Sequence, residues 1–504
     1  MEFQISFSLI VIIVATVFFV MKLLNIFKKP NSYPNFPPPG PWKMPLIGNL
    51  LSVVSRQPPH VVLRNLARKH GPLMHLQLGE VSALVVSSPQ LAKEIMVKKD
   101  LSFADRPEIQ ASKMIAYNSS DLVFAPYGNY WRQLRKICSF ELLSAKKVQS
   151  FSYIREEEAK FMIESIVSSS ISPINLTEKI FTLTNTVVSR AAFGKIPKDQ
   201  DLLLHMLHET TDVASGFGIV DLFPSYKLLH IVTGMSSKMA KIHQTVDKIF
   251  NNVIAEHQKD KENTKGGVDE DGLLDILLRL KDSGDLEFPI SLDNIKAVLL
   301  DMLSAGTDTS SATVEWALCE LLRNPEMLEK AQAEVREVFK GKLSLQESEF
   351  QGLKYLKMVI KETMRLHPAG PLMLPRECRE SCEINGYVIP VHTKVIINGW
   401  ALGRDPEYWH DAERFLPERF ENSSIDYSGK YFEYLPFGAG RRMCPGMSFG
   451  VANVEIILFN LLYHFDWKLP GGMKPEDLDM SETLGVACRR KHNLYLIATP
   501  YTPL

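Results

Sequence analysis

The sequence predicts a mainly helical protein with small β-sheets: one globular domain behind an N-terminal transmembrane anchor helix. Apolar residues recur at helical spacing over most of the chain, most clearly over residues 291–323. Strand patterns are confined to short apolar runs beside Gly, Asn or Pro. The third observation is an uncharged stretch at residues 3–21, next to the amino terminus.

The uncharged stretch at residues 3–21 has the length of a membrane span. About 20 apolar residues cross a bilayer core, and no charged residue lies between Phe3 and Met21. Lysines follow the run, beginning at Lys22, whereas only Glu2 precedes it, so the body is expected to face the cytosol. A cleaved signal peptide is the alternative. In a signal peptide, however, the positive charges precede the apolar run and a small-residue cleavage site follows it, and neither is found here. We expect an uncleaved anchor over residues 1–29.

A proline-rich stretch, PPPGP at 37–41, follows the anchor. Clustered prolines stiffen an extended backbone, so residues 30–41 are expected to act as a hinge. No Ser/Gly-rich linker or repeat divides the remainder, which predicts a single domain over residues 42–504.

Composition narrows the class of protein. The chain has 504 residues, of which 45% are hydrophobic and 23% charged, as in ordinary globular proteins. A formal net charge of −1 argues against nucleic acid as a partner. The 6 cysteines have no disulfide-framework spacing, which favours reduced thiols. Cys378 and Cys382 lack the further ligands that a zinc site needs.

The expected helices and strands follow from the spacing of apolar residues and from the positions of turn-forming residues. A hairpin is expected at Pro72–Ser87, a second at Glu383–Ile397 with an Asn-Gly turn, and a strand pair near Ala487–Ile497. Helices are expected at Val148–Ser168, Leu202–Val213, Met235–His257, Ser291–Arg323 and Pro325–Phe339, the fourth with Ser291 as its N-cap.

The clearest candidate site is the loop FGAGRRMCPG at 437–446. A thiolate beside a metal needs N–H donors and nearby positive charge. Gly440 and Gly446 are expected to form tight turns, and Arg442 to reach an anionic group. Sulfur as the only protein ligand suits iron in a macrocycle better than zinc, so Cys444 is the predicted metal ligand.

The long predicted helix carries AGTDTS at 305–310 near its middle. Small side chains at Ala305 and Gly306 leave room for a flat ligand and dioxygen beside the backbone. Thr309 points to the same place and can bond to the carbonyl four residues back. Asp308 beside it is a carboxylate that can relay protons.

Three other charged or aromatic patterns accompany these motifs. Trp131 and Arg135 share one helix face, where an indole N–H and a guanidinium suit a carboxylate. Glu362 and Arg365 are spaced as a charge pair, and PERF at 417–420 adds Arg419.

Taken in order, these strings resemble those of the cytochromes P450. The matching strings are the proline hinge, W-R-x-x-R, A-G-x-D-T, E-x-x-R, P-E-R-F and F-x-x-G-x-R-x-C-x-G, and their details are similar to the plant endoplasmic-reticulum type, nearest to the terpenoid oxygenases. The resemblance implies a haem (heme, iron protoporphyrin IX) ligated by Cys444. It implies further cofactor contacts at Trp131, Arg135, Ala305, Gly306, Arg376, Phe437, Gly438 and Arg442, a structural cluster at Glu362, Arg365 and Arg419, and a substrate side that includes Met302, Leu372 and Val486.

The activity that the resemblance implies is monooxygenation of a small apolar substrate, a plant terpenoid, with O2 and NADPH. No G-x-G-x-x-G follows a predicted strand, so electrons are expected from NADPH–cytochrome P450 reductase, docking near Arg132, Lys136 and Arg441. Asp308 and Thr309 would manage proton delivery. The enzyme would be a single-pass protein of the endoplasmic reticulum membrane with a cytosolic catalytic domain.

Several alternatives stay open at this point. The substrate could be an alkaloid or a phenolic or flavonoid compound. A haem-thiolate isomerase or dehydratase would act without a reductase, although the Asp308–Thr309 pair argues against it. A non-enzymatic haem sensor would have no use for the oxygen-handling helix.

Overall fold

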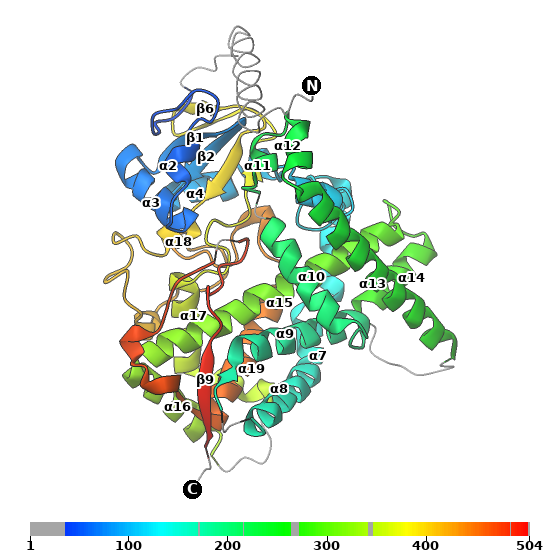
Figure 1. Cartoon of the computed structure of the whole chain (residues 1–504), viewed down its shortest axis with the longest axis vertical. Helices are drawn as coiled ribbons and strands as arrows, with labels where there is room; N and C mark the ends of the chain where they lie inside the picture. The colour runs from blue at the N-terminus through cyan, green and yellow to red at the C-terminus, as the bar shows by residue number, and fades with distance from the viewer. Residues whose placement is uncertain are drawn as a thin grey trace, which may run out of the picture.

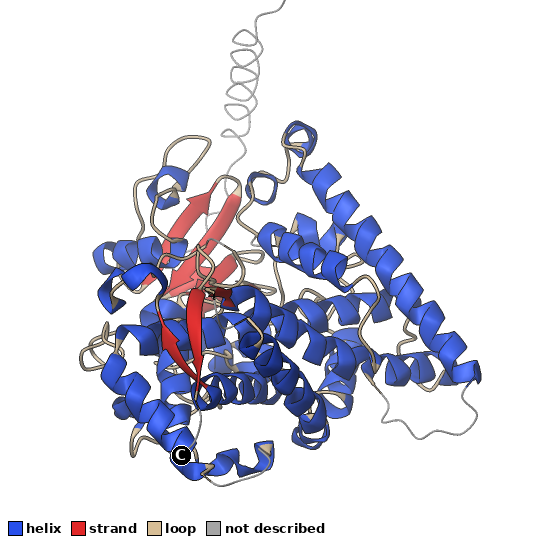
Figure 2. Cartoon of the chain, turned by 60° about the horizontal axis from the view of Figure 1, so that its bottom comes forward, coloured by secondary structure: helices blue, strands red, loops and turns tan. Residues whose placement is uncertain are grey.

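Helices fill most of the molecule, and the largest sheet lies towards one end, at the upper left of Figure 1. The computed structural model describes residues 36–169, 172–214, 216–263, 272–340, 346–483 and 485–501. The predicted anchor and the hinge before residue 36 lie outside these ranges. Figure 2 shows the strands as a minor part of a helical body, which confirms the predicted fold class.

The helices vary from single turns to rods that cross the domain. Their bounds are α2 Leu50–Val53, α3 Pro59–His70, α4 Pro89–Lys93, α5 Gln110–Met114, α6 Asn129–Glu141, α7 Ala145–Ser150, α8 Ser152–Val167, α9 Leu176–Phe193, α10 Gln200–Val213, α11 Ile219–Leu222, α12 Lys227–Val232, α13 Met235–Asn263, α14 Leu273–Ser283, α15 Leu292–Arg323, α16 Pro325–Val338, α17 Lys354–Leu366, α18 Gly399–Leu402 and α19 Met447–His464.

Within the described ranges, the strands form three small sheets. Their bounds are β1 Leu73–Leu78, β2 Val81–Val86, β3 Ile174–Asn175, β4 Arg376–Glu377, β5 Cys382–Ile384, β6 Tyr387–Ile389, β7 Lys394–Ile397, β8 Phe465–Lys468 and β9 Tyr495–Pro500. The sheet orders are β1-β2-β7-β4, β3-β9-β8 and β5-β6. Strand β7 runs parallel to β2, with Val86 opposite Ile397, and the other pairs are antiparallel.

The first predicted hairpin is confirmed, but the second is only half right. Strands β5 and β6 turn at Asn385-Gly386, where both residues have positive φ as the predicted turn requires. The remaining residues, Lys394–Ile397, leave this hairpin and become an interior strand between β2 and β4. Val395, Ile396 and Ile397 are buried in succession, so they need neighbours on both faces rather than one hairpin partner.

The expected strand pair near Ala487–Ile497 is wrong. Only Tyr495–Pro500 forms a strand there, and its partners are β3 and β8, which are distant in sequence. Residues before it make a single bridge, Glu482 to Arg490. A local pattern shows that a segment is extended but not which distant strand completes it.

The predicted long helices are largely confirmed. The helix expected at Val148–Ser168 is broken into α7 and α8 at Phe151, which has a non-helical ψ of 7° and a buried ring. Helix α15 starts after Ser291, whose hydroxyl accepts from the Asn294 N–H while the Asn294 side chain accepts from the Ser291 N–H. The predicted N-cap is therefore in place.

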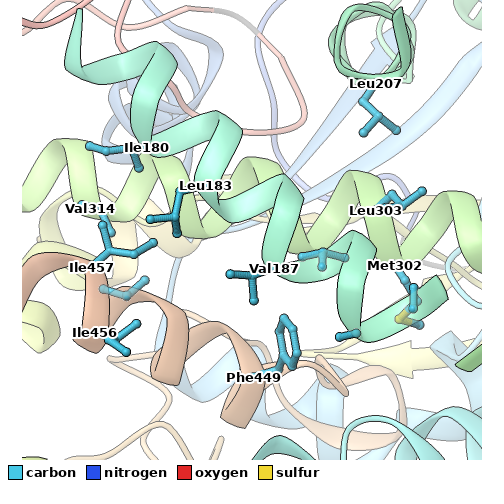
Figure 3. Packing of buried hydrophobic residues seen from close by; sticks show 14 of the residues in the cluster. Ile180, Leu183, Val187, Leu207, Met302, Leu303, Val314, Phe449, Ile456 and Ile457 are labelled. Carbon is cyan, nitrogen blue, oxygen red and sulfur yellow. The ribbon is translucent and has the colours of Figure 1, made fainter. Parts of the chain in front are cut away.

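The core lies where α15 crosses α9 and α19 (Figure 3). Leu183 and Val187 of α9, Leu303 and Val314 of α15, and Ile457 of α19 are all buried there. Each such side chain contributes about 1.5–3 kcal/mol by leaving water. This packing fixes the middle of α15 between two neighbours, so its polar residues are held in place.

Among the described helices, α19 alone is long and apolar enough to span a bilayer, and 56% of it is buried inside the domain. It is a core helix.

Candidate active site

A cavity of about 400 Å³ lies between α15 and the cysteine loop. Ala305, Gly306, Asp308 and Thr309 line it from α15 and Cys444 from the loop, together with Met302, Phe437, Gly438, Arg442 and Gly446. Two motifs that are far apart in the sequence therefore meet at one cavity. Cys444 lies deep inside the fold, and its accessible surface faces this cavity.

The backbone of the cysteine loop is tightly constrained. The Cys444 N–H donates to the Phe437 carbonyl at 2.9 Å. Gly438 and Gly440 both have a φ of 70°, and a Cβ at Gly440 would lie 2.0 Å from the Met96 carbonyl oxygen. The predicted turn at Gly440 is confirmed. Gly446 also lies in a turn, but its φ of −86° suits any residue, so the expected need for glycine at this position is wrong.

The electrostatics at the thiol are mixed. Burial raises the pKa of Cys444, while the Gly446 N–H and the Arg135 guanidinium oppose that rise. These two groups favour the thiolate that a metal ligand requires. Arg135 also ties α6 to the loop, because its Nη2 donates to the Met443 carbonyl at 2.6 Å.

Arginines converge on the cavity wall beside the loop. Arg376 is paired with Asp100 at 2.7 Å and donates to the Ala439 carbonyl. Arg442 donates to the Ala104 and Ala125 carbonyls, but its buried Nη1 has no partner among the described residues.

Arg106, which sequence reasoning missed, completes this arginine cluster. It donates to the Leu374 and Pro375 carbonyls, and its buried Nε has no partner in the described ranges. Burial and the positive charges of Arg442 and Arg376 lower the pKa of Arg106. The cluster thus keeps guanidinium N–H donors that have no partner in the described part of the chain, which fits the two carboxylates of a haem.

Trp131 does not present its indole N–H to the cavity as expected. That N–H donates to the Leu122 carbonyl at 2.9 Å, and the ring is 3% exposed. The Arg442 guanidinium lies 4.3 Å from the centre of this ring, so Trp131 supports an arginine of the cluster. It still borders the cavity.

The middle of α15 presents an alcohol and an acid. The Thr309 hydroxyl donates to the Ala305 carbonyl at 2.8 Å, as its position in the helix predicts. Desolvation raises the pKa of Asp308 to about 6, although the positive charge of Arg489 opposes the shift. Gly306 has a second reason to be small: a Cβ there would lie 3.0 Å from Val188 Cγ2 of α9.

The predicted substrate side is divided between two adjacent cavities. Met302 and Val486 line the main cavity, and Val486 also lines a neighbouring cavity of about 200 Å³. Leu372 borders only this smaller cavity, whereas the next residues, Met373 and Leu374, border both.

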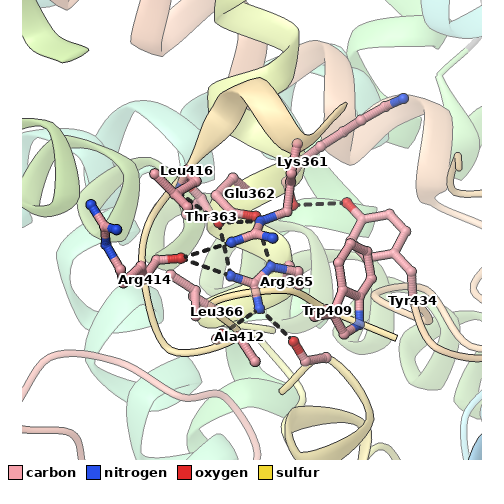
Figure 4. Close-up of polar contacts among 12 residues, drawn as sticks. Lys361, Glu362, Thr363, Arg365, Leu366, Trp409, Ala412, Arg414, Leu416 and Tyr434 are labelled. Carbon is pink, nitrogen blue, oxygen red and sulfur yellow. Dashed lines mark hydrogen bonds and ion pairs between the residues drawn. The ribbon is translucent and has the colours of Figure 1, made fainter. Parts of the chain in front are cut away.

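Behind the site, Glu362, Arg365 and Arg419 form a buried cluster (Figure 4). Arg365 donates to Glu362 through Nε at 2.7 Å and Nη2 at 2.8 Å, and Arg419 Nε donates at 2.9 Å. Arg365 also holds the carbonyls of Gly403 and Ala412. These bonds fix the irregular segment that leads to the cysteine loop.

The fold and site together define a haem-thiolate protein, in which a cysteine loop and a long helix line the cavity that would hold the cofactor. The profile of the cytochrome P450 family matches residues 37–497. The chain belongs to the cytochrome P450 family, and it is a monooxygenase with a thiolate-ligated haem that takes electrons from a redox partner.

Plant relatives are similar over almost the whole chain. Premnaspirodiene oxygenase of Hyoscyamus muticus is 55% identical, covering 95% of this chain and 96% of the relative. 5-Epiaristolochene 1,3-dihydroxylase of Nicotiana tabacum is 53% identical, with coverage of 95% and 96%. Desmethyl-deoxy-podophyllotoxin synthase of Sinopodophyllum hexandrum is 53% identical, with coverage of 92% and 91%. A solved zebrafish cytochrome P450 with progesterone has a TM-score of 0.76 at 25% identity, covering 88% of this chain and 100% of that one.

Proposed function

We propose that this P450 inserts one oxygen atom from O2 into a small terpenoid held above Cys444. The observation that carries the proposal is the mainly apolar cavity that Thr309 and Cys444 both line. In such a cavity shape, rather than polar contacts, selects which carbon faces the cofactor. The names of the relatives from Hyoscyamus muticus and Nicotiana tabacum support a terpenoid substrate.

The residues have distinct roles in this proposal. Cys444 Sγ would bind the iron, and the guanidinium groups of Arg106, Arg376 and Arg442 would receive the haem carboxylates. The haem, when bound, supplies the binding and activation of O2. The Thr309 hydroxyl and the Asp308 carboxyl would hold and pass protons on the α15 side of the cavity, while its apolar walls exclude bulk water.

Electrons are proposed to arrive from NADPH–cytochrome P450 reductase on the side where α6 meets the cysteine loop. Arg132 and Lys136 are exposed on α6, and Arg441 is exposed on the loop. The bond from Arg135 to the Met443 carbonyl links these two elements next to Cys444. Positive charge here suits an acidic partner surface.

The protein is proposed to sit on the cytosolic side of the endoplasmic reticulum membrane, held by residues 1–29. Exposed apolar side chains of α2 and α12 support membrane contact through the surface that these two helices form. Leu51 is 64% exposed, and Ile231 and Val232 are 77% and 74% exposed. Other residues of α2 and α12 pack on one shared cluster, so both helices belong to the same end of the molecule.

The test is expression in yeast microsomes with a plant reductase, followed by feeding of sesquiterpene hydrocarbons and, separately, flavonoids and alkaloids. We expect a thiolate-type carbon monoxide band and an oxygenated sesquiterpene that forms only with NADPH. A product formed without NADPH would favour the isomerase or dehydratase instead. A thiolate band with turnover of flavonoids or alkaloids alone would refute the substrate class but not the chemistry.

A different substrate class is the second candidate. It is favoured by the relative from Sinopodophyllum hexandrum. Its sequence is nearly as similar to this chain as those of the other two plant relatives, but its name refers to a different compound. The same feeding panel separates the two candidates.

A further inference from the structure

Arg489 lies between the buried acid of α15 and the surface of α10. Its Nη2 donates to Asp308 Oδ2 at 2.9 Å and to the Thr211 hydroxyl at 2.6 Å, and its Nη1 donates to His208 Nδ1. The carboxylate of Asp212 lies 4.0 Å from the same Nη2 and is 58% exposed. The guanidinium thus connects Asp308, whose side chain is 5% exposed, to Asp212 at the solvent boundary.

The bonding pattern fixes the protonation of His208. An arginine Nη can only donate, so His208 Nδ1 must accept, which requires the neutral ring with its proton on Nε2. Burial and the charge of Arg489 lower the pKa of His208 to about 4, in agreement with a neutral ring. The ring also stacks on Phe181 at 4.1 Å, so its position is held.

Asp308 depends on Arg489 for its orientation. Its Oδ2 is held by the guanidinium, whereas its buried Oδ1 has no hydrogen-bond partner in the described part of the chain. Without Arg489, nothing charged would compensate the carboxylate at this depth. Thr211 also contacts the Asp308 carboxyl, so Arg489 from the C-terminal segment is the charged partner, and Thr211 a neutral one, in setting the direction in which the acid points.

The other partners of Arg489 belong to the helix that borders the substrate. Thr211 both bonds to Arg489 and lines the main cavity, where Thr210 and Ala214 are its neighbours. A substrate that displaces this part of α10 therefore also acts on the guanidinium that holds Asp308.

We propose that Arg489 is a positioning residue that orients Asp308 for proton delivery and couples that acid to substrate contacts on α10. The inference rests on the proton-handling role proposed for Asp308. Arg489 does not touch the substrate space itself, and it acts through Asp308 and Thr211. With a poorly fitting substrate, the acid should be misplaced, so that electrons from NADPH form hydrogen peroxide instead of product even when the haem is intact.

The test compares Arg489→Gln, Arg489→Lys and Asp308→Asn in reconstituted full-length enzyme with reductase. We expect Arg489→Gln to lower product per NADPH about tenfold, at the low end of general acid–base effects, with a matching rise in hydrogen peroxide. The solvent deuterium isotope effect on turnover should rise, while the substrate-binding spectrum keeps its amplitude. Arg489→Lys should recover part of the coupling because it retains the charge.

Arg490→Gln is the matched control. This neighbouring arginine also pairs with α15, at 3.5 Å from Glu315, and donates to the Asp479 carbonyl at 2.7 Å, but it does not border the main cavity. Its loss should lower thermal stability and leave coupling and the isotope effect unchanged. If Arg489→Gln does not fold, Thr211→Val removes one bond of the same guanidinium and should raise peroxide release in the same direction.

The pH profile gives an independent measurement. The titratable groups that face Arg489 are Asp308, His208 and Asp212, with His205 and Glu209 beside His208. Because Arg489 lowers the pKa of Asp308, its removal should move the acid limb of the coupling profile to higher pH.

The outcomes separate the two claims. Wild-type coupling in Arg489→Gln, alongside loss of coupling in Asp308→Asn, would overturn the inference about Arg489 alone. Wild-type coupling in Asp308→Asn would overturn the role proposed for the acid. An equal loss of coupling in Arg490→Gln would show that Arg489 acts only through stability.

Discussion

Replacing Glu362 by Gln is the sharpest test of how the cysteine loop is supported. The Glu362 carboxylate accepts from Arg365 twice, from Arg419 and from the Leu416 N–H, at 2.7–2.9 Å. The side chains of Glu362 and Arg365 are both 0% exposed. The substitution keeps the shape but leaves two guanidinium groups without their anion.

The magnitude follows from that burial. Removing one partner of a buried ion pair costs about 3–5 kcal/mol, because the remaining charge is uncompensated. The whole stability of a domain is about 5–15 kcal/mol, so this loss is a large share. The effect should reach the active site, because Arg365 also holds the carbonyls of the segment before the cysteine loop.

The assay is haem content from the carbon monoxide spectrum, together with the half-life of that spectrum on heating. We expect little haem in Glu362→Gln and a half-life shortened by at least tenfold. Lys330→Gln is the control, since Lys330 pairs at 2.8 Å with Glu418 of the same turn but is 58% exposed, and its loss should change neither quantity. A Glu362→Gln protein with normal haem content and half-life would refute the reasoning.

Three further predictions use the same preparation. Cys444→Ser should abolish the thiolate-type carbon monoxide band while circular dichroism stays helical; persistence of the band would rule out Cys444 as the ligand. Thr309→Ala should keep substrate binding but divert NADPH electrons to hydrogen peroxide, and unchanged coupling would disprove the role of its hydroxyl. The acceptor patterns at Asn118, Asn175 and Asn422 should carry no glycan, because the body is proposed to face the cytosol. An endoglycosidase-sensitive mass shift would contradict that orientation.

The sequence predicts best what is encoded locally. The turn at Gly440, the N-cap at Ser291 and the Glu362–Arg365 pair each depend on residues a few positions apart, so spacing alone reveals them. Strand β7 shows the limit of prediction from local sequence. Its apolar residues predict an extended segment, but its parallel partner β2 is about 300 positions away.

The residues that were missed carry no local signal. Arg106 lies in an ordinary loop and Arg489 in a basic run near the carboxyl end. Each matters because the fold brings it to a charge that is distant in sequence: Arg106 to Arg376 and Arg442, and Arg489 to Asp308. Trp131 shows the converse, since its motif was recognised but its N–H is taken up by a loop carbonyl.

Gly306 allows the two reasons for a small residue to be separated. From the sequence, its role is to leave room for a flat ligand and dioxygen; in the fold, an added methyl would also press on Val188 at 3.0 Å. Alanine favours a helix over glycine by about 1 kcal/mol, so Gly306→Ala is destabilising only if that contact cannot relax. We expect a small net loss of thermal stability that Val188→Ala reverses, with a coupling energy of about 1 kcal/mol between the two sites.

The double variant then distinguishes packing from chemistry. If helix packing alone requires the glycine, Gly306→Ala combined with Val188→Ala should regain both stability and coupled turnover. If the cofactor side requires it, stability should return while the rate of autoxidation and the release of peroxide stay abnormal. Because Gly306 and Val188 both border the cavity, we expect the second outcome. Full recovery of coupled turnover in the double variant would show that α9, and not the bound oxygen, demands a glycine at this position.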